Sequence, residues 1–405
     1  MAAERIQTLV IGGGQAGLAM SYRLKQRGLP HLVLERHRIA ERWRSERWDG
    51  LRFQFPNWSV RLPDFAFPHD DPDGFSASSD ILDYITAYAA FVAPPIRCGV
   101  AVTALRRGDH GFIAEISSGA IEADNVVVAT GPYQRAVIPA LRESIKLFQV
   151  HASRYANPET LPEGAVLVVG AGASGAQISE ELLRAGRRVF LSVGRHTRLP
   201  RRYRGRDLIW WLREMGIDQT PVEMRGPSRL LPVISGAHGG DTIDFRRFAA
   251  EGVTLLGRIK AARDGVLEIA PDLADSLAGG DATYAGFIDR ADAYVAAAKL
   301  DMPQDAAARA VRPDPACVTA PVRRLDLGAE KINSVIWATG YGLDFSWIDV
   351  PVLNPQGEPV HRQGITAIPG LYFLGLQWLS RMNSSFLSGV GDDAAVLADH
   401  IAGRV

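Results

Sequence analysis

Short apolar runs alternate with helical patterns along much of the chain. An apolar run at 9–11 leads into a glycine-rich stretch at 12–17, and apolar residues at helical spacing continue to residue 24. Gly28 ends this pattern, and another apolar run follows at 32–34. A strand, a helix and a strand in this order predict a βαβ unit, in which the helix connects two parallel strands.

The same pattern returns near the middle of the chain. An apolar run at 165–169 precedes a second glycine-rich stretch at 170–175, a helical pattern and an apolar run at 189–191. Two more predicted strands, one at 125–130 and one within 332–341, end in Ala-Thr-Gly. The sequence therefore predicts an α/β protein with two Rossmann-like dinucleotide-binding domains.

Both glycine-rich stretches match G-x-G-x-x-G. In the first, Gly12 permits a tight turn, Gly14 lets the backbone approach a pyrophosphate, and Gly17 lets the helix pack closely on the strand. Free N–H groups at the helix N-terminus would bind the phosphates, although an ordinary glycine-rich turn is the alternative. The expected cofactor contacts are Gly12, Gly14, Gln15, Ala16 and Gly17 in the first motif and Gly170, Gly172, Ala173, Ser174 and Gly175 in the second.

The two units differ where their second strands end. The first ends in Glu35, followed by Arg36, and both are expected cofactor contacts; the Glu35 carboxylate would accept hydrogen bonds from ribose hydroxyls. Val193 occupies the equivalent place in the second unit, and Arg195 lies two residues further on. Because a guanidinium binds phosphate oxygens with two hydrogen bonds, Arg195 suits the 2′-phosphate of NADPH, with a solvated basic loop as the alternative.

Loops at the carboxyl ends of the predicted strands supply further candidates. Trp43 and Arg44 belong to an aromatic and basic loop that would line a flavin, although aromatic packing alone also accounts for such a loop. Small residues after the two Ala-Thr-Gly strands would let the backbone lie against a cofactor; these are Thr130, Gly131, Thr339 and Gly340. A run of arginines (Arg201, Arg202, Arg204 and Arg206) is expected to be solvated or to cap backbone carbonyls.

Two later helices are predicted from apolar spacing. One begins at Asp281 and runs to residue 300, with an apolar face for core packing or for contact with a second subunit in a homodimer. The other runs from Asp392 to His400, with Asp392 or Asp393 as its N-cap. Its positive end would stabilise reduced flavin, or the helix simply closes the sheet.

Composition narrows the function classes. The chain has 405 residues, enough for roughly two to three domains. Lys+Arg and Asp+Glu number 45 each, so no global field attracts nucleic acid. The two cysteines, Cys98 and Cys317, form neither a C-x-x-C dithiol nor a zinc spacing, and no metal site is expected. We expect a cytoplasmic protein, since the first strand starts too early for a signal peptide and no apolar stretch could span a membrane.

The motifs occur in an order that resembles the class B flavin-dependent monooxygenases, which include flavin-containing, N-hydroxylating and indole-pyruvate monooxygenases. They are GGGQAG at 12–17, PDFAFP at 63–68, ATG at 129–131, HASRYANPE at 151–159, GAGASG at 170–175 and ATGY at 338–341. The resemblance implies a discontinuous FAD domain at 1–158 and 318–405, with an NADPH domain inserted at 159–317.

The resemblance also implies an activity. NADPH would reduce FAD, O2 would add at C4a to form a C4a-(hydro)peroxyflavin, and one oxygen atom would pass to a small organic substrate. N- or S-oxygenation, or hydroxylation of an activated carbon, is favoured over lactone formation, because Tyr155 is not followed by the Trp-Pro of Baeyer–Villiger enzymes. The alternatives are an NADPH-dependent flavin reductase or oxidase without a stable peroxyflavin, and a nucleotide-binding regulator without turnover.

One candidate catalytic residue is carried over from the resemblance. The flavin-side Asn of the family falls on Gln54, ten residues before Asp64, and Gln54 could hydrogen-bond the flavin. His151 is interpreted as a structural linker residue rather than an acid–base catalyst. The expected cofactors are FAD and NADP, and the expected partners are a small-molecule substrate and O2.

Overall fold

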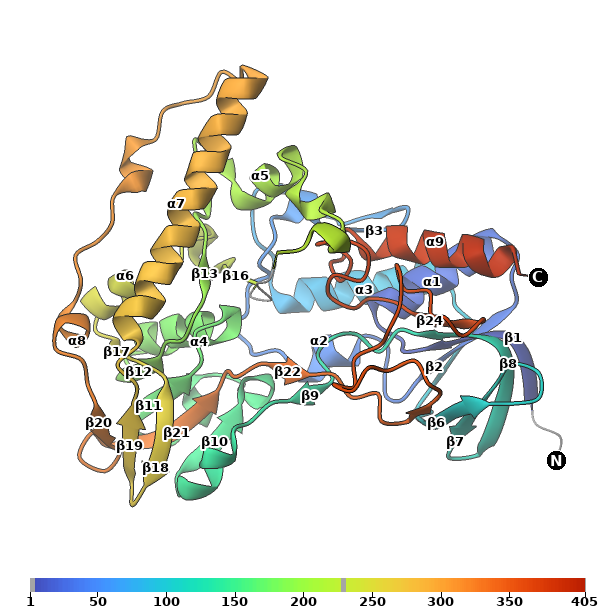
Figure 1. Ribbon diagram of the computed structural model, residues 1–405, viewed down its shortest axis with the longest axis horizontal. Coiled ribbons are helices and arrows are strands. Elements are labelled where there is room, and N and C mark those ends of the chain that lie inside the picture. The colour runs from blue at the N-terminus through green and yellow to red at the C-terminus, as the bar shows by residue number, and fades with distance from the viewer. Residues whose placement is uncertain (1–3, 227–230, 405) are drawn as a thin grey trace.

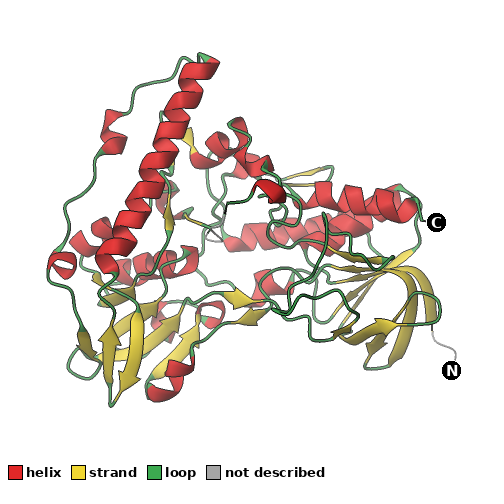
Figure 2. Cartoon of the chain, in the orientation of Figure 1, coloured by secondary structure: helices red, strands yellow, loops and turns green. Residues whose placement is uncertain are grey.

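The computed structural model describes residues 4–226 and 231–404. The chain forms two lobes, each built on a sheet that carries helices (Figures 1 and 2). We call them the first lobe, which holds both ends of the described chain, and the second lobe, which contains the long helix at the left of Figure 1. The α/β class expected from the sequence is therefore confirmed.

The first lobe contains an eight-stranded sheet within the described residues. Its strands are β1 (Glu4–Ile11), β2 (His31–Glu35), β5 (Ile96–Cys98), β6 (Val102–Arg107), β7 (Phe112–Ile116), β8 (Gly119–Val128), β23 (Ile348–Asp349) and β24 (Leu371–Phe373). They lie in the order β23-β6-β7-β8-β1-β2-β5, with β24 paired to β8. The helices of this lobe are α1 (Gln15–Gln26), α2 (Glu41–Ser45), α3 (Ser78–Val92) and α9 (Val390–Ala402).

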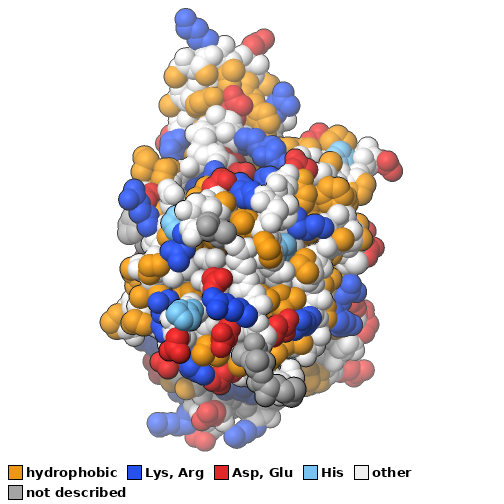
Figure 3. Space-filling model, turned by 90° about the vertical axis from the view of Figure 1, so that its right-hand side faces the viewer, with side chains coloured by type: hydrophobic (Ala, Val, Ile, Leu, Met, Phe, Trp, Pro, Cys, Tyr) orange, Lys and Arg blue, Asp and Glu red, His pale blue; other side chains and the backbone are white. Residues whose placement is uncertain are grey.

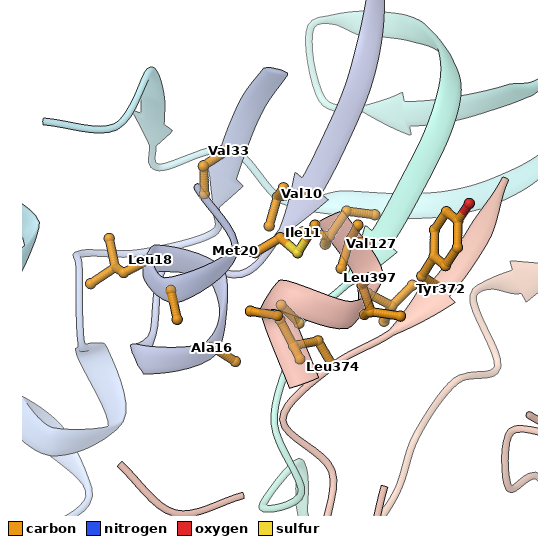
Figure 4. Close-up of a cluster of buried hydrophobic side chains, with 14 of the residues drawn as sticks. Val10, Ile11, Ala16, Leu18, Met20, Val33, Val127, Tyr372, Leu374 and Leu397 are labelled. Atoms are coloured by element: carbon orange, nitrogen blue, oxygen red, sulfur yellow. The ribbon is translucent and has the colours of Figure 1, made fainter. Parts of the chain in front are cut away.

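The core of the first lobe lies where α1 and α9 pack against the parallel strands. Val10 of β1, Met20 of α1 and Leu397 of α9 point toward one another and are fully buried (Figure 4). Because β1 pairs with β2 on one side and β8 on the other and is covered by helices, its sequence reads as a continuous apolar run. This burial holds the end of β1, and therefore the glycine-rich loop, in place.

The second lobe contains a five-stranded parallel sheet among the described residues. Its strands are β10 (Phe148–His151), β11 (Ala165–Val169), β12 (Val189–Ser192), β17 (Thr254–Leu256) and β21 (Ile332–Trp337), in the order β10-β21-β11-β12-β17. Its helices are α4 (Ala173–Arg184), α5 (Leu208–Glu214), α6 (Phe245–Ala250), α7 (Leu273–Ala298) and α8 (Ala316–Thr319). A three-stranded sheet of β18 (Ile259–Arg263), β19 (Val266–Ile269) and β20 (Arg324–Asp326) accompanies it.

Two short strands join the lobes. β9 (Arg135–Ala136) and β22 (Tyr341–Gly342) pair antiparallel, with Tyr341 opposite Ala136 (Figure 1). Each follows one of the Ala-Thr-Gly sequences, at 129–131 and 338–340. The remaining strands form three pairs, β3 (Arg61–Leu62) with β4 (Phe65–Ala66), β13 (Thr197–Arg198) with β16 (Pro232–Val233), and β14 (Arg202–Tyr203) with β15 (Arg206–Asp207).

The expected domain boundaries differ from the observed sheets. β10 and β21 belong to the sheet of the second lobe, although the expected NADPH domain at 159–317 leaves both of them out. β21 lies between β10 and β11, so the second sheet is completed by a strand that arrives late in the chain. Strand partners far apart in sequence are set by tertiary pairing, which motif spacing does not reveal.

Two expected helix starts are wrong. α7 begins at Leu273 rather than Asp281, because Gly280 lies inside the helix, where it allows close approach to the His196 ring. A Cβ on Gly280 would lie 2.4 Å from His196 Nε2. α9 begins at Val390 with Gly389 as its N-cap residue, so neither Asp392 nor Asp393 is the cap.

The surface carries both signs of charge. On the face shown in Figure 3, Lys and Arg side chains are interspersed with Asp and Glu side chains. Mixed charge of this kind agrees with the balanced composition and offers no single-sign patch on that face. Within residues 4–226 and 231–404, no helix is long and apolar enough to cross a membrane.

Candidate functional site

The first glycine loop is tight at two positions and open at a third. Gly12 has a φ of +119°, and a Cβ there would lie 2.5 Å from Ala129 O. A Cβ on Gly17 would lie 1.8 Å from Gly12 O, so the helix can approach the strand only without a side chain. A Cβ on Gly14 would meet nothing within 4 Å. The backbone at Gly14 therefore faces open space at the N-terminus of α1, as a phosphate-binding loop requires.

The second glycine loop repeats this geometry. A Cβ on Gly170 would lie 2.5 Å from Ala338 O, and one on Gly175 would lie 1.9 Å from Gly170 O. A Cβ on Gly172 would again meet nothing within 4 Å. The residues of both loops therefore fit a dinucleotide, with the open glycine at the N-terminus of α1 in one lobe and α4 in the other.

Backbone register places Glu35 and Val193 at equivalent positions. Gly12 N donates to Leu34 O, just before Glu35, and Gly170 N donates to Ser192 O, just before Val193. The equivalence of Glu35 and Val193, which was counted from the glycine motifs in the sequence, therefore agrees with the hydrogen bonds between the strands.

Glu35 is tied to the glycine loop. One carboxylate oxygen accepts a hydrogen bond from Gly13 N at 2.7 Å, and the other accepts from His37 N at 2.9 Å. In the second lobe Val193 is fully buried, whereas Arg195 is exposed and has no hydrogen-bond or ion-pair partner in the part of the chain that the structure describes. The two strand ends therefore differ in charge, with an acid at the end of β2 and an exposed cation beyond β12.

The residues after β8 take part in the crossing between lobes. Gln134 Nε2 donates to Thr130 Oγ1 at 2.9 Å and to Gly131 O at 2.8 Å. The Thr130 and Gly131 groups that were expected to face a cofactor are therefore also braced by the chain that leads into the second lobe.

The residues after β21 are braced in a similar way. Thr339 Oγ1 donates to Val137 O, and His151 Nε2 lies 3.1 Å from Gly340 O. His151 also accepts a hydrogen bond from Ser153 N, and burial lowers the pKa of its imidazole. These contacts support a structural role for His151.

Gln15 connects the first glycine loop to the chain before α9. Its Nε2 donates to Ser385 O at 2.9 Å, and a Cβ on Gly375 would lie 2.7 Å from the Cβ of Ala16. Asp393, in the first turn of α9, is buried, which raises the pKa of its carboxyl, and it accepts a hydrogen bond from Ser380. The loop before α9 is therefore packed onto the start of α1.

An aromatic row leads away from this region. Trp43 lies 5.7 Å from Phe53 between ring centroids, Phe53 lies 5.3 Å from Phe55, and Phe55 lies 4.9 Å from Phe386. Gln54 lies between Phe53 and Phe55 in the sequence and is half-buried. Its side-chain amide has no hydrogen-bond partner among the described residues.

Arg44 and Arg36 are placed differently from Trp43. Arg44 Nη2 donates to Thr86 Oγ1 at 3.3 Å and its Nε donates to Ile39 O, so its side chain is directed to α3. Arg36 is exposed at the end of β2. The structure brings Trp43 into the aromatic row and leaves these two arginines outside it.

Two basic residues have side-chain contacts that the sequence analysis did not predict. Arg47 lies over the Trp43 ring, 4.8 Å from its centroid, and donates only to Glu46 O among the described residues. Arg201, expected to be solvated or to cap backbone carbonyls, is 1% exposed and bonds both Asp207 and a backbone oxygen of the first lobe. Arg204 is likewise buried and paired with Asp292, so solvation is wrong for both residues. Hydrophobic periodicity does not predict such buried ion pairs, because the acidic partner lies on another element.

The described residues hold no group of three or more His, Cys, Asp or Glu side chains placed to bind a metal ion. Cys98 and Cys317 are both free thiols. They lie in different lobes, on β5 and α8 respectively.

Residues 9–212 match the model of the pyridine nucleotide-disulphide oxidoreductase family. The chain belongs to this family. An uncharacterized oxidoreductase, CzcO-like, from Geobacillus kaustophilus is 35% identical to this oxidoreductase over 401 residues, which cover 98% of each chain. Indole-3-pyruvate monooxygenase YUCCA8 of Oryza sativa subsp. indica is 32% identical over 214 residues, 48% of this chain and 49% of the relative.

A solved structure extends the likeness. The flavin-containing monooxygenase from Stenotrophomonas maltophilia superposes on this oxidoreductase with a TM-score of 0.67 at 18% identity, covering 99% of both chains. This likeness shows the fold, and together with the sequence match to YUCCA8 it confirms the resemblance to flavin-dependent monooxygenases that the motifs indicated.

Proposed function

We propose that this protein is a flavoprotein monooxygenase with FAD and NADP as its cofactors. The first lobe is the FAD domain, made from both chain ends, and the second lobe is the NADPH domain inserted between them. The observation that carries the proposal is the pair of open glycine loops, alike at Gly14 and Gly172, which end in different chemistry at Glu35 and Arg195. Two dinucleotides of different kinds account for that difference.

Bound FAD would accept electrons from NADPH, activate O2 and supply one oxygen atom to a small organic substrate. NADPH provides two electrons, one oxygen atom enters the product, and the other leaves as water. The residues of this chain would bind and orient the reactants: Gly14 and the N-terminus of α1 would hold the FAD pyrophosphate, Glu35 would hold the ribose, and Gly172 with Arg195 would hold NADPH. Gln54 offers its free amide to the flavin.

The test follows the incorporation of oxygen atoms into products and the consumption of electrons from NADPH. The purified protein is loaded with FAD, supplied with NADPH or NADH and with ¹⁸O2, and incubated with a panel of amines, sulfides, ketones and 2-oxo acids. We expect NADPH to be used in preference to NADH, and one product to carry a single ¹⁸O atom in proportion to NADPH consumed. Release of all the electrons as hydrogen peroxide with every substrate would contradict a monooxygenase.

A second candidate is an NADPH-dependent flavin reductase or oxidase that stores no oxygen adduct. The description of the matched family, which names disulphide oxidoreductases, favours this alternative. The thiols of Cys98 and Cys317 lie in different lobes and cannot serve as a redox dithiol, so electrons would pass directly from flavin to an external acceptor. Oxidation of NADPH that depends on a quinone or disulfide acceptor and needs no O2 would support it.

A further inference from the structure

Arg201 of the second lobe reaches the loop that carries Gln54 in the first lobe. Its Nη1 donates a hydrogen bond of 2.7 Å to the backbone oxygen of Gln54. The Arg201 side chain is almost completely buried, so this bond is shielded from water and depends on the two lobes being seated together.

The guanidinium of Arg201 is held from the second lobe. Its Nε donates to Asp207 Oδ2 at 2.8 Å and its Nη2 to Asp207 Oδ1 at 3.3 Å. Asp207 also accepts from Ile209 N at 2.8 Å, which ties it to the start of α5. This two-point attachment fixes the plane of the guanidinium and leaves Nη1 directed at the first lobe.

The surrounding backbone is packed too closely for the loop to shift freely. A Cβ on Gly236 would lie 1.9 Å from Phe53 O, and one on Gly240 would lie 2.6 Å from the Phe75 ring. The Arg201 guanidinium itself lies 4.3 Å from the centroid of the Phe75 ring. The main chain at Gln54 is therefore fixed by the second lobe, while the Gln54 amide has no partner among the described residues.

We infer that Arg201 is a positioning residue, which fixes the main chain at Gln54 so that the side-chain amide is presented to the flavin. The seating of the NADPH domain then sets the environment of the FAD in the other domain. This inference rests on the proposed function, because it takes Gln54 as a flavin-facing group. If Arg201 only stabilised the contact between the lobes, its substitution would lower the stability of the fold. It would not change the spectrum of the bound flavin as loss of the Gln54 amide does.

The test compares bound FAD in R201K, Q54A and the double variant R201K/Q54A. Lysine retains the charge beside Asp207 but cannot hold both Asp207 and Gln54 O with the geometry of a guanidinium. R204K is the matched control, since Arg204 is also a buried arginine of this segment, pairs with Asp292 and, among the described residues, forms its hydrogen bonds and ion pair within the second lobe. The readouts are the visible spectrum of the bound flavin and the FAD dissociation constant from flavin fluorescence, neither of which requires turnover.

We expect R201K to shift the flavin bands in the direction given by Q54A and to weaken FAD binding on the order of 10-fold. The double variant should shift no further than Q54A, and R204K should match the wild-type spectrum. An R201K spectrum equal to that of R204K, a Q54A spectrum equal to wild type, or additive shifts in the double variant would overturn the inference. If R201K does not fold, D207N, which keeps the guanidinium and removes its ionic anchor, is judged by the same criteria.

The experiment also separates this inference from the proposed function. A wild-type protein that binds no FAD would overturn the proposed function and the inference with it. A wild-type protein that binds FAD, with a spectrum unchanged by R201K and D207N, would overturn the inference alone.

Discussion

Glu181 of α4 accepts a hydrogen bond of 3.1 Å from the phenol of Tyr155, at the contact between the two lobes. Gly50, from the first lobe, packs closely against this carboxylate, because a Cβ added to Gly50 would lie 2.2 Å from Glu181 Oε1. Burial is the main cause that raises the pKa of Glu181 to about 7, and the nearby Asp49 carboxylate adds to it. A titratable group therefore lies where the lobes meet.

The raised pKa makes stability depend on pH. The folded protein keeps the Glu181 proton up to about pH 7, whereas the unfolded chain releases it near the ordinary value of 4.5. The stabilising contribution is thus complete below about pH 4.5 and is lost as the pH rises toward 7. We expect the melting temperature of the wild type to fall relative to that of Glu181→Gln between pH 5 and about 7.5.

Circular dichroism melts at a series of pH values measure this difference. Glu115→Gln is the control, because Glu115 lies on the surface of β7 and pairs only with exposed groups. Parallel profiles of the wild type and Glu181→Gln would contradict the prediction.

Alanine substitutions at two glycines of the first loop should have different effects, one on stability and the other on FAD binding. Gly17→Ala places a Cβ against Gly12 O and should cost about 1–3 kcal/mol of unfolding free energy or more, as overpacking does. Gly14→Ala enters open space with an ordinary φ of −88°, so it should fold like the wild type but bind FAD more weakly. Urea unfolding of the apoprotein and FAD titration separate the two effects; equal stability of the two variants would show that Gly17 is not sterically required.

Glu35 should contribute to FAD affinity. Glu35→Gln removes a charged acceptor at the end of β2 and should weaken FAD binding roughly 10- to 100-fold, the range for hydrogen bonds to charged groups. Fluorescence titration of the apoprotein gives the dissociation constant, with Glu115→Gln again as the control. Unchanged affinity in Glu35→Gln would assign the carboxylate to bracing Gly13 and His37 alone.

Arg195 should select between the two nicotinamide nucleotides. Arg195→Gln should raise the KM for NADPH roughly 10- to 100-fold and leave that for NADH almost unchanged, because only NADPH carries the 2′-phosphate. Arg263→Gln is a control on an exposed strand of the same lobe. Steady-state reduction of the flavin with each nucleotide provides the comparison, and an equal loss with both would show that Arg195 does not contact the 2′-phosphate.

Short-range patterns predicted the two βαβ units well. The stretch from Thr8 to Glu35 carries its own strand, turn, helix and second strand, and the apolar run of each strand reflects burial on both faces. The glycine positions follow from backbone contacts within the unit, such as Gly17 against Gly12 O. The equivalence of Glu35 and Val193 could likewise be counted along the chain.

Helix starts were predicted less well, and the membership of the second sheet was not predicted. The helix expected to begin at Asp281 begins at Leu273 and includes Gly279 and Gly280, and Gly280 packs against His196. β21 returns to the second sheet from a distant part of the chain, beyond the expected boundary at 317. In both cases a partner remote in sequence outweighed local propensity.

The sequence by itself determined the α/β class, the two glycine loops and the acid and base that distinguish them. These features arise from contacts between residues close along the chain, so periodicity and spacing contain them. Only the tertiary structure decided that Arg201 is buried on Gln54 O and that Glu181 lies under Gly50. Both contacts form between lobes that fold from separate segments, and burial of a charge depends on what surrounds it in space rather than on its neighbours in sequence.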